Sequence, residues 1–160
     1  MHDIVSQLKR RRGGGYELLA YKADGRWRDV KSTDINDFIK EIAGADFTAK
    51  DFRTWSATVL AAVALAVSAE AATSKTARKR AVARAVKEVA HYLGNTPAVC
   101  RSSYLDPRVI DRFEAGATIA PALSRLGEGA AFGQLAIQGA IEKAVLDLLD
   151  GEAASSVRAA

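Results

Sequence analysis

The sequence contains few of the residues on which disulfide frameworks, zinc sites and membrane spans depend. Its 160 residues include one cysteine, two histidines and three prolines. A single cysteine excludes an intramolecular disulfide framework, and two histidines do not complete a tetrahedral zinc site with it. No run of 18 apolar residues is present, and the first residues lack the basic-then-apolar order of a signal peptide. The composition therefore predicts a cytoplasmic protein without a metal site or a membrane span.

Positive charge is in mild excess, and its clustering is more informative than its total. The formal net charge is +4, and the isoelectric point is about 9.3. One cluster, Lys9 to Arg12, precedes the triple glycine Gly13 to Gly15. This pattern suits a flexible phosphate-binding arm as well as a solvated chain end, and the sequence leaves both interpretations open.

The order of expected elements is a short helix, one β-hairpin and then helices alone. The first helix is expected over 2–12 and the hairpin over about 16–30, with strands 16–21 and 27–30 joined at Asp24-Gly25, a strong hairpin signal. Helices follow from residue 33 onward: from a cap at Thr33 or Asp34 to about 42, from 48 through the alanine-rich run 61–72, from a cap at Ser74 to about 93, after Pro107 as far as Gly116, and over 117–125 and 131–149. The chain has the length of one domain, and residues 151–160 are predicted to be a disordered tail.

The helix expected over 74–93 is strongly basic on its outer side. Only Glu88 opposes its bases, which are Lys75, Arg78, Lys79, Arg80, Arg84 and Lys87. A charged helical face is often no more than solvated, but this excess of one sign favours a surface for the DNA backbone.

Two short motifs follow each other in the order and spacing of a known family. The first, "FTAKDFRTW", contains Arg53 near the start of a helix, and the second, "LGNTPAVCRSSYLDP", contains Asn95 and Tyr104. Together they resemble the type IB DNA topoisomerases in their bacterial, poxvirus-like branch. The resemblance extends over about residues 5–115. It implies a mainly α fold, the helical C-terminal lobe of the topoisomerase IB and tyrosine recombinase catalytic domain, with one short hairpin near the N-terminus.

The resemblance also implies roles for individual residues. Tyr104 would be the nucleophile that forms a 3′-phosphotyrosyl bond, and Arg53 would hold a non-bridging phosphate oxygen. Asn95, at a position where many relatives have histidine, would donate a second hydrogen bond. Double-stranded DNA would be the substrate, with Lys50 and Arg101 joining the basic helix as DNA-binding residues. Supercoil relaxation of this type needs no ATP, divalent metal or other cofactor.

Two further catalytic residues of the family match no segment of this chain. They are an early arginine and a lysine on a hairpin, which acts as general acid for the 5′-hydroxyl. Lys22 and Lys31 lie on or beside the expected hairpin, but in the family this hairpin follows the one that carries the lysine. Residues 1–150 are therefore expected to be a partial, C-terminal catalytic domain, weakly active or inactive alone. The sequence leaves open whether a separate polypeptide supplies the arginine and lysine or whether the chain is a gene fragment or has a misplaced start, and a nucleoid-associated location follows from the substrate.

Two other classes of function remain open. Tyrosine recombinases share the second arginine and the nucleophile, but their usual signature has histidine where this chain has Lys50 and Asn95. A truncated product that binds DNA without cutting it is the non-enzymatic alternative. No helix-turn-helix spacing indicates an unrelated DNA-binding module.

Overall fold

The computed structural model describes residues 2–44, 46–127 and 135–151. Within these ranges it contains eight helices and one two-stranded sheet near the N-terminus, which confirms the mainly α fold with one hairpin. The chain divides into two compact units, Met1–Ala49 (unit 1) and Lys50–Ala160 (unit 2). No helix in the described ranges is long and apolar enough to cross a membrane. The assignment of residues 1–150 to one catalytic domain stays a prediction.

Unit 1 combines two short helices with the hairpin. Its elements are α1 (His2–Arg10), β1 (Ala20–Ala23), β2 (Arg26–Asp29) and α2 (Ser32–Ala43). The strands are antiparallel, and Ala23 pairs with Arg26 across the turn. Asp24 and Gly25 both have positive φ, 51° and 75°, as a two-residue type I′ turn requires. The Asp-Gly prediction is therefore confirmed.

Arg11 organises the loop between α1 and β1. Its guanidinium forms an ion pair with Asp29 at 3.2 Å and donates to the carbonyl of Leu18 at 3.0 Å; the carbonyls of Gly15 and Glu17 also accept from it. The side chain is only 8% exposed. Neither interpretation of the Lys9–Arg12 run holds for Arg11, since it is neither a free phosphate-binding group nor a solvated one. Because these loop carbonyls bond the guanidinium, the strand begins at Ala20, later than expected.

The start of α2 differs from the expected caps. The helix begins at Ser32, and the backbone N–H of Lys31 donates to Oδ2 of Asp34 at 2.7 Å. Asp34 is thus a residue of the first turn rather than the cap, and Thr33 is also inside the helix. No apolar residue in the described part of unit 1 is buried.

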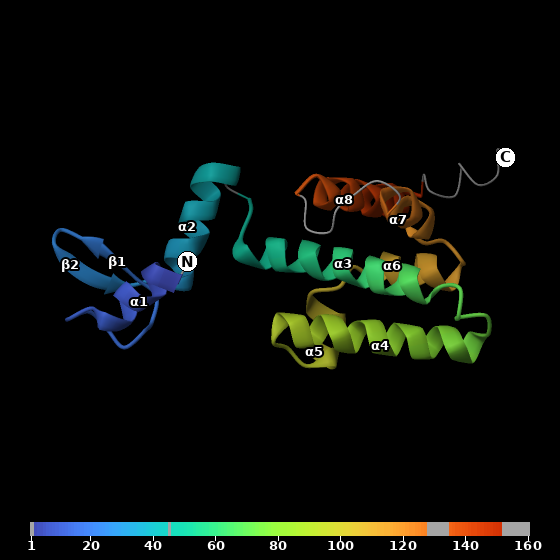
Figure 1. The fold of residues 1–160 in the computed structure, drawn as a ribbon, viewed down its shortest axis with the longest axis horizontal. Helices are drawn as coiled ribbons and strands as arrows, with labels where there is room; N and C mark the ends of the chain where they lie inside the picture. The colour runs from blue at the N-terminus through green and yellow to red at the C-terminus, as the bar shows by residue number, and fades with distance from the viewer. Residues whose placement is uncertain (1, 45, 128–134, 152–160) are drawn as a thin grey trace. The chain divides into compact units, whose positions relative to one another are not determined.

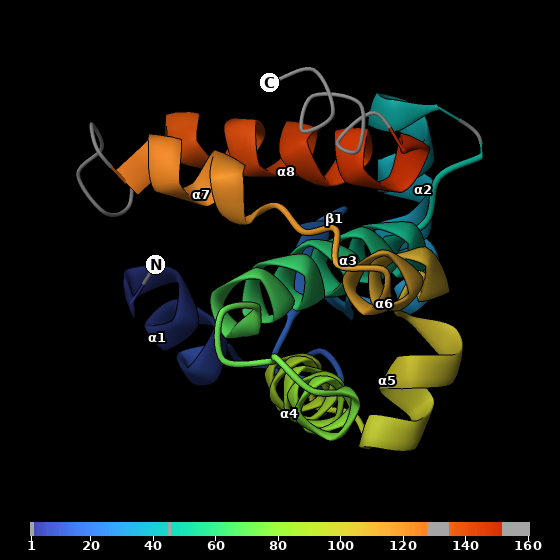
Figure 2. The same cartoon turned by 90° about the vertical axis from the view of Figure 1, so that its right-hand side faces the viewer.

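Unit 2 is built from six helices in the described ranges. They are α3 (Ala49–Ser68), α4 (Lys75–Leu93), α5 (Pro97–Ser103), α6 (Pro107–Glu114), α7 (Ala120–Gly127) and α8 (Leu135–Asp150). Figure 1 shows α3 and α4 side by side and running in opposite directions. Figure 1 and Figure 2 together place α3 and α6 between α4 and α5 on one side and α7 and α8 on the other. The antiparallel pairing brings the start of α3 to the end of α4.

Many of the buried positions on α3 and α4 are occupied by alanine. Ala57, Ala61 and Ala62 of α3 are buried, as are Ala81 and Ala85 of α4. Alanine loses no side-chain entropy on burial, so these positions join the core at little conformational cost. The buried stripe of α3 thus follows its alanines, Thr58 and Leu65. The larger apolar side chains near the start of α3 lie outside this stripe, because Phe52 is exposed and Trp55, Val59, Leu60 and Val63 are only partly buried.

The ends of α4 follow the local chemistry of its sequence. Oγ of Ser74 accepts from the N–H of Ala77 at 3.1 Å, which confirms Ser74 as the N-terminal cap. Gly94, which follows the last residue of the helix, is left-handed with φ 68° and ψ 32°. The N–H groups of Gly94 and Asn95 both donate to carbonyls in the last turn of α4. The N–H of Asn95 donates to the Ala90 carbonyl at 2.8 Å.

Other predicted boundaries shift by a few residues. Helix α3 ends at Ser68 instead of 72, and α7 begins at Ala120 instead of 117. The predicted start of the last helix at 131 and nearly all of the predicted tail, 152–160, lie outside the described residues.

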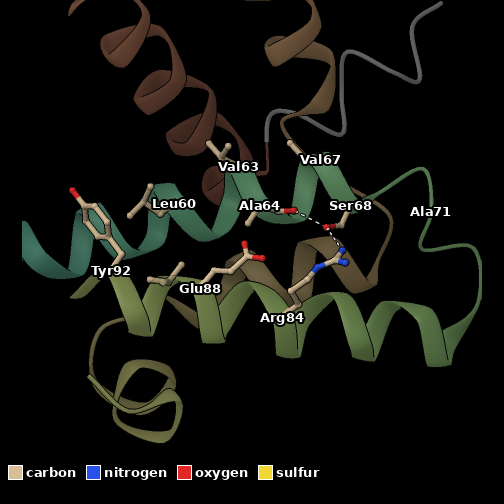
Figure 3. Close-up of a pocket in the computed structure, with 10 residues that line it drawn as sticks. Leu60, Val63, Ala64, Val67, Ser68, Ala71, Arg84, Glu88 and Tyr92 are labelled. Atoms are coloured by element: carbon tan, nitrogen blue, oxygen red, sulfur yellow. Dashed lines mark hydrogen bonds between the residues drawn. The ribbon is translucent and has the colours of Figure 1, made fainter. Parts of the chain in front are cut away.

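A groove of about 620 Å³ runs between α3 and α4 on their outer side (Figure 3). Its lining is mostly apolar and includes Leu60 and Val63, with Tyr92 at one end. Arg84 crosses from α4 and donates to Oγ of Ser68 at 3.0 Å, and Ser68 in turn donates to the Ala64 carbonyl at 2.8 Å. These two hydrogen bonds tie α4 to the last turn of α3.

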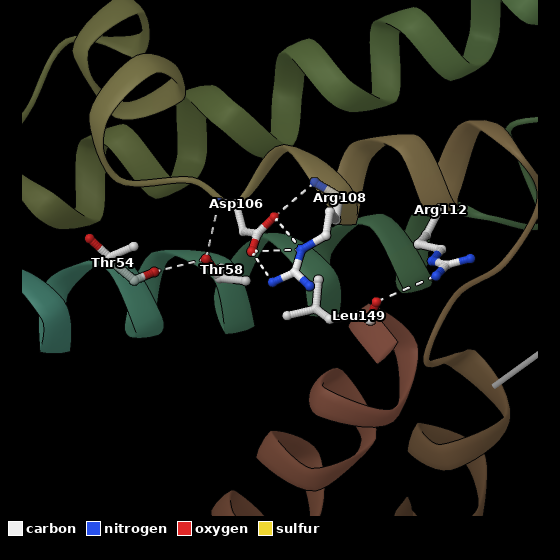
Figure 4. Close-up of polar contacts among 6 residues, drawn as sticks. All are labelled: Thr54, Thr58, Asp106, Arg108, Arg112 and Leu149. Carbon is white, nitrogen blue, oxygen red and sulfur yellow. Dashed lines mark hydrogen bonds and ion pairs between the residues drawn. The ribbon is translucent and has the colours of Figure 1, made fainter. Parts of the chain in front are cut away.

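Asp106 caps helix α6 and forms an ion pair with Arg108 (Figure 4). Its Oδ1 accepts from the Arg108 N–H at 2.9 Å, and Oδ2 lies 2.7 Å from Arg108 Nη2. The hydrogen bond from the Arg108 side chain lowers the pKa of Asp106 below its ordinary value. The ionised carboxylate is therefore the form that stabilises the start of this helix.

The burial of Ala85 predicts that a larger side chain at this core position is destabilising. Ala85→Leu should lower the free energy of unfolding by about 1–3 kcal/mol, since a close-packed core has no space for three more carbon atoms. Ala83→Leu on the exposed face of the same helix should change it by less than about 0.5 kcal/mol. Urea unfolding followed by circular dichroism measures both, and equal effects would contradict the packing.

The Asp106 cap predicts a pH-dependent contribution to stability. Because the folded-state pKa is lowered, the contribution is fully present above the unfolded pKa of about 3.9 and disappears as the pH falls through the folded value. Asp106→Asn keeps an acceptor for the cap but loses the charge. Wild type should exceed it in stability by at most about 1 kcal/mol at pH 7, since Arg108 is largely exposed, and the gap should close in acid. A gap equal at pH 7 and pH 3 in urea titrations would contradict this role.

Candidate active site

Arg53 extends from the beginning of α3 to the end of α4. Its Nη2 donates to the backbone carbonyl of Leu93 at 3.0 Å. Leu93 is the last residue of α4, where carbonyls have no partner within the helix. A cationic donor at a helix C-terminus also interacts favourably with the helix dipole. Arg53 therefore lies at the Leu-Gly-Asn segment, where it is held by a backbone acceptor.

Tyr104 lies directly below the guanidinium of Arg53. It follows the last residue of α5, is partly buried and packs against the core of unit 2. The Arg53 Cζ atom is 5.0 Å from the centroid of its ring, which is a cation–π contact. Among the described residues, no hydrogen bond to the Tyr104 hydroxyl is present. The ring is thus held in place, while the hydroxyl is left without a described hydrogen-bond partner.

Asn95 converges on the same carbonyl as Arg53. Its Nδ2 donates to the Leu93 carbonyl through a long hydrogen bond of 3.5 Å. The Leu93 oxygen thus accepts from the guanidinium and from the amide, two side chains 42 positions apart. Because the acceptor is a backbone oxygen, no residue type marks it in the sequence, and the sequence analysis did not identify it.

The structure brings the three residues named from the motifs into one site. Two donors, one of them a fixed cation, converge on one oxygen beside a tyrosine whose hydroxyl is free of described partners. Planar guanidinium donors are well suited to phosphate oxygens, with which they form charge-assisted hydrogen bonds. Such an arrangement can bind a phosphate group next to a nucleophilic hydroxyl.

Cys100, the other potential nucleophile in this segment, does not compete with Tyr104. It is fully buried on α5, and burial raises the pKa of its thiol. A buried thiol held in its neutral form is unreactive at neutral pH. Within the described parts of the chain, no cluster of three or more His, Cys, Asp or Glu side chains could hold a metal ion.

The basic residues named from the sequence have different surroundings. Those of the predicted DNA-binding set that are exposed are Lys50, Lys75, Lys79, Arg80, Arg84 and Arg101. Arg78 differs, because it is partly buried and its guanidinium donates to the carbonyls of Ala72 at 3.3 Å and Glu114 at 2.9 Å. Arg78 therefore ties α4 to the end of α6, which its place among basic neighbours did not reveal.

Comparison with known proteins agrees with the motifs and the fold. A family model described as the catalytic core of eukaryotic DNA topoisomerase I matches residues 4–119. DNA topoisomerase 1B of Acanthamoeba polyphaga mimivirus is 37% identical over 94 residues, which are 56% of this chain and 28% of that protein. The chain thus spans less than a third of this relative's length. Because the family model covers more than half of the chain, the chain belongs to the DNA topoisomerase I family that this catalytic core defines.

Proposed function

We propose that this chain supplies the nucleophile and two phosphate-binding donors of a type IB DNA topoisomerase, of the bacterial, poxvirus-like branch. The observation that carries the proposal is the convergence of Arg53 and Asn95 on one acceptor next to the Tyr104 ring. In complex with DNA, a non-bridging phosphate oxygen takes the place of the Leu93 carbonyl as the acceptor of Arg53. The exchange is favourable because an anionic oxygen binds a guanidinium more strongly than a neutral carbonyl does.

The chemical step is an in-line displacement at phosphorus. The Tyr104 oxygen attacks the scissile phosphate and releases its proton, a bond between tyrosine oxygen and phosphorus forms, and the bond to the 5′-oxygen breaks. The leaving 5′-oxygen takes up a proton, and religation is the reverse of these steps. Arg53 and Asn95 stabilise the charge that develops on the phosphoryl oxygens, where fixed donors are most effective. Rotation of the nicked strand between the two steps relaxes supercoils without ATP or metal.

The basic side of α4 is the proposed surface for the DNA backbone. Lys75, Lys79, Arg80 and Arg84 of this helix are exposed, and Lys50 and Arg101 flank the candidate site at the start of α3 and on α5. Arg78 is left out because both ends of its guanidinium bond backbone carbonyls. Contacts of this kind give affinity without sequence preference.

A complete site of this class needs more than the chain provides. No segment of these 160 residues matches the early arginine or the lysine that protonates the leaving 5′-oxygen, so we propose that they come from elsewhere, either from another part of the same protein or from a separate polypeptide. The alternative in which the chain binds DNA without cutting it makes the opposite prediction for covalent chemistry. Both alternatives share a DNA-associated location.

Because the proposed site lacks its general acid, the chain alone should cleave only a substrate whose leaving group needs no proton. Supercoiled plasmid should be relaxed very slowly or not at all, because expulsion of the 5′-oxygen depends on the absent acid. A duplex with a 5′-bridging phosphorothiolate should form a covalent adduct, because a thiolate leaves without protonation. Denaturing gel electrophoresis of labelled DNA measures the adduct.

Variants of the three site residues serve as controls. Tyr104→Phe should abolish the adduct, and Arg53→Ala should lower its rate of formation by about 10²–10³-fold. Adduct formation by Tyr104→Phe would disprove the nucleophile. No adduct with wild type would favour the non-catalytic alternative, and brisk plasmid relaxation in chelator would contradict the need for catalytic residues from outside these 160 residues.

The basic surface predicts a salt-dependent affinity for duplex DNA. Lys79→Glu with Arg80→Glu should weaken binding at low salt and reduce the slope of log affinity against log salt by about 1.8, the equivalent of two phosphate contacts. The charge-matched control is Arg125→Glu with Lys143→Glu, on α7 and α8. Fluorescence anisotropy over a salt series measures both, and equal effects of the two pairs would contradict a DNA surface on α4.

A further inference from the structure

Thr58 is the only buried polar residue among the described core positions, and it joins the two segments that carry the site. It lies on α3, five residues after Arg53, and is 2% exposed. Its Oγ1 donates to the Thr54 carbonyl at 2.8 Å and accepts from the N–H of Asp106 at 3.2 Å. Figure 4 shows this hydroxyl between the helix and the start of α6.

The two hydrogen bonds fix the chain on either side of the site. Asp106 is two residues after Tyr104, and Thr54 is the neighbour of Arg53. The N–H of Asp106 belongs to the tight turn between α5 and α6, where a buried donor without a partner is unfavourable. The Asp106 side chain also forms an ion pair with Arg108. The segment that follows the nucleophile is therefore attached to the helix that carries the arginine through one hydroxyl.

We propose that Thr58 is a positioning residue, whose hydroxyl sets the place of Tyr104 relative to Arg53 and so to the phosphate. It touches neither DNA nor the reacting atoms, and it acts through the Asp106 backbone. The inference rests on the proposed function, because it concerns the geometry of that reaction. Helix packing alone does not require a hydroxyl here, since valine has the same shape and lacks only the donor and acceptor.

The test compares three variants of the 160-residue chain on the duplex with the bridging phosphorothiolate. Thr58→Val removes both hydrogen bonds at nearly constant volume, Thr58→Ser keeps the hydroxyl, and Thr76→Val makes the same substitution at an exposed site on α4. Thr58→Val should slow adduct formation at saturating DNA by about 10–100-fold, as small displacements of reacting groups do. Its DNA affinity should remain unchanged. Thr58→Ser should recover most of the rate, and Thr76→Val should match wild type.

A second measurement tests the hydrogen bond without catalysis. Amide hydrogen exchange at Asp106 should become about ten-fold faster in Thr58→Val and remain slow in Thr58→Ser and Thr76→Val. A rate of adduct formation in Thr58→Val equal to that of wild type would overturn the positioning role, as would a parallel loss of rate in Thr58→Ser. If wild type forms no adduct, the proposed function fails, and exchange at Asp106 still decides the inference, since unchanged exchange in Thr58→Val would overturn it.

Discussion

The carbonyl oxygen of Leu93 has no partner within its own helix, and the candidate site is arranged around it. Gly94 turns the chain into the left-handed region, so the N–H groups of Gly94 and Asn95 bond earlier carbonyls of the last turn. Leu93 is then left to side chains, and Arg53 and Asn95 both donate to it. The unpaired carbonyl at the end of α4 therefore holds the two side-chain donors, Arg53 and Asn95, next to Tyr104.

The same contact holds the candidate site together without a ligand. The guanidinium of Arg53 is held by a carbonyl on one side and by the Tyr104 ring on the other. Donors that are already oriented lose little freedom when they bind an anion. Under the proposed function, a phosphate oxygen would replace the carbonyl as acceptor, and the helices that position the donors would stay packed.

Features that depend only on neighbouring residues were predictable from the sequence. Contacts between residues far apart in the chain were not. Ser74, Gly94 and the Asp24-Gly25 turn act on their immediate neighbours, so their roles follow from the residues beside them. Arg53 and Tyr104 were placed by motif resemblance. Arg11, Arg78 and Thr58 have partners up to 48 positions away. Their side chains are of types that usually face solvent, and no periodic pattern distinguishes the inward ones. The proposed DNA-binding residues and catalytic roles remain predictions.

The hydrogen bond from Arg53 to the Leu93 carbonyl has a consequence for how the candidate site responds to change elsewhere. Arg53 and Leu93 belong to opposite members of an antiparallel helix pair, so the separation of the two helices sets the distance across which the guanidinium must extend. A substitution that widens or tilts this pair, even far from Arg53, would therefore also move the guanidinium relative to the Tyr104 ring.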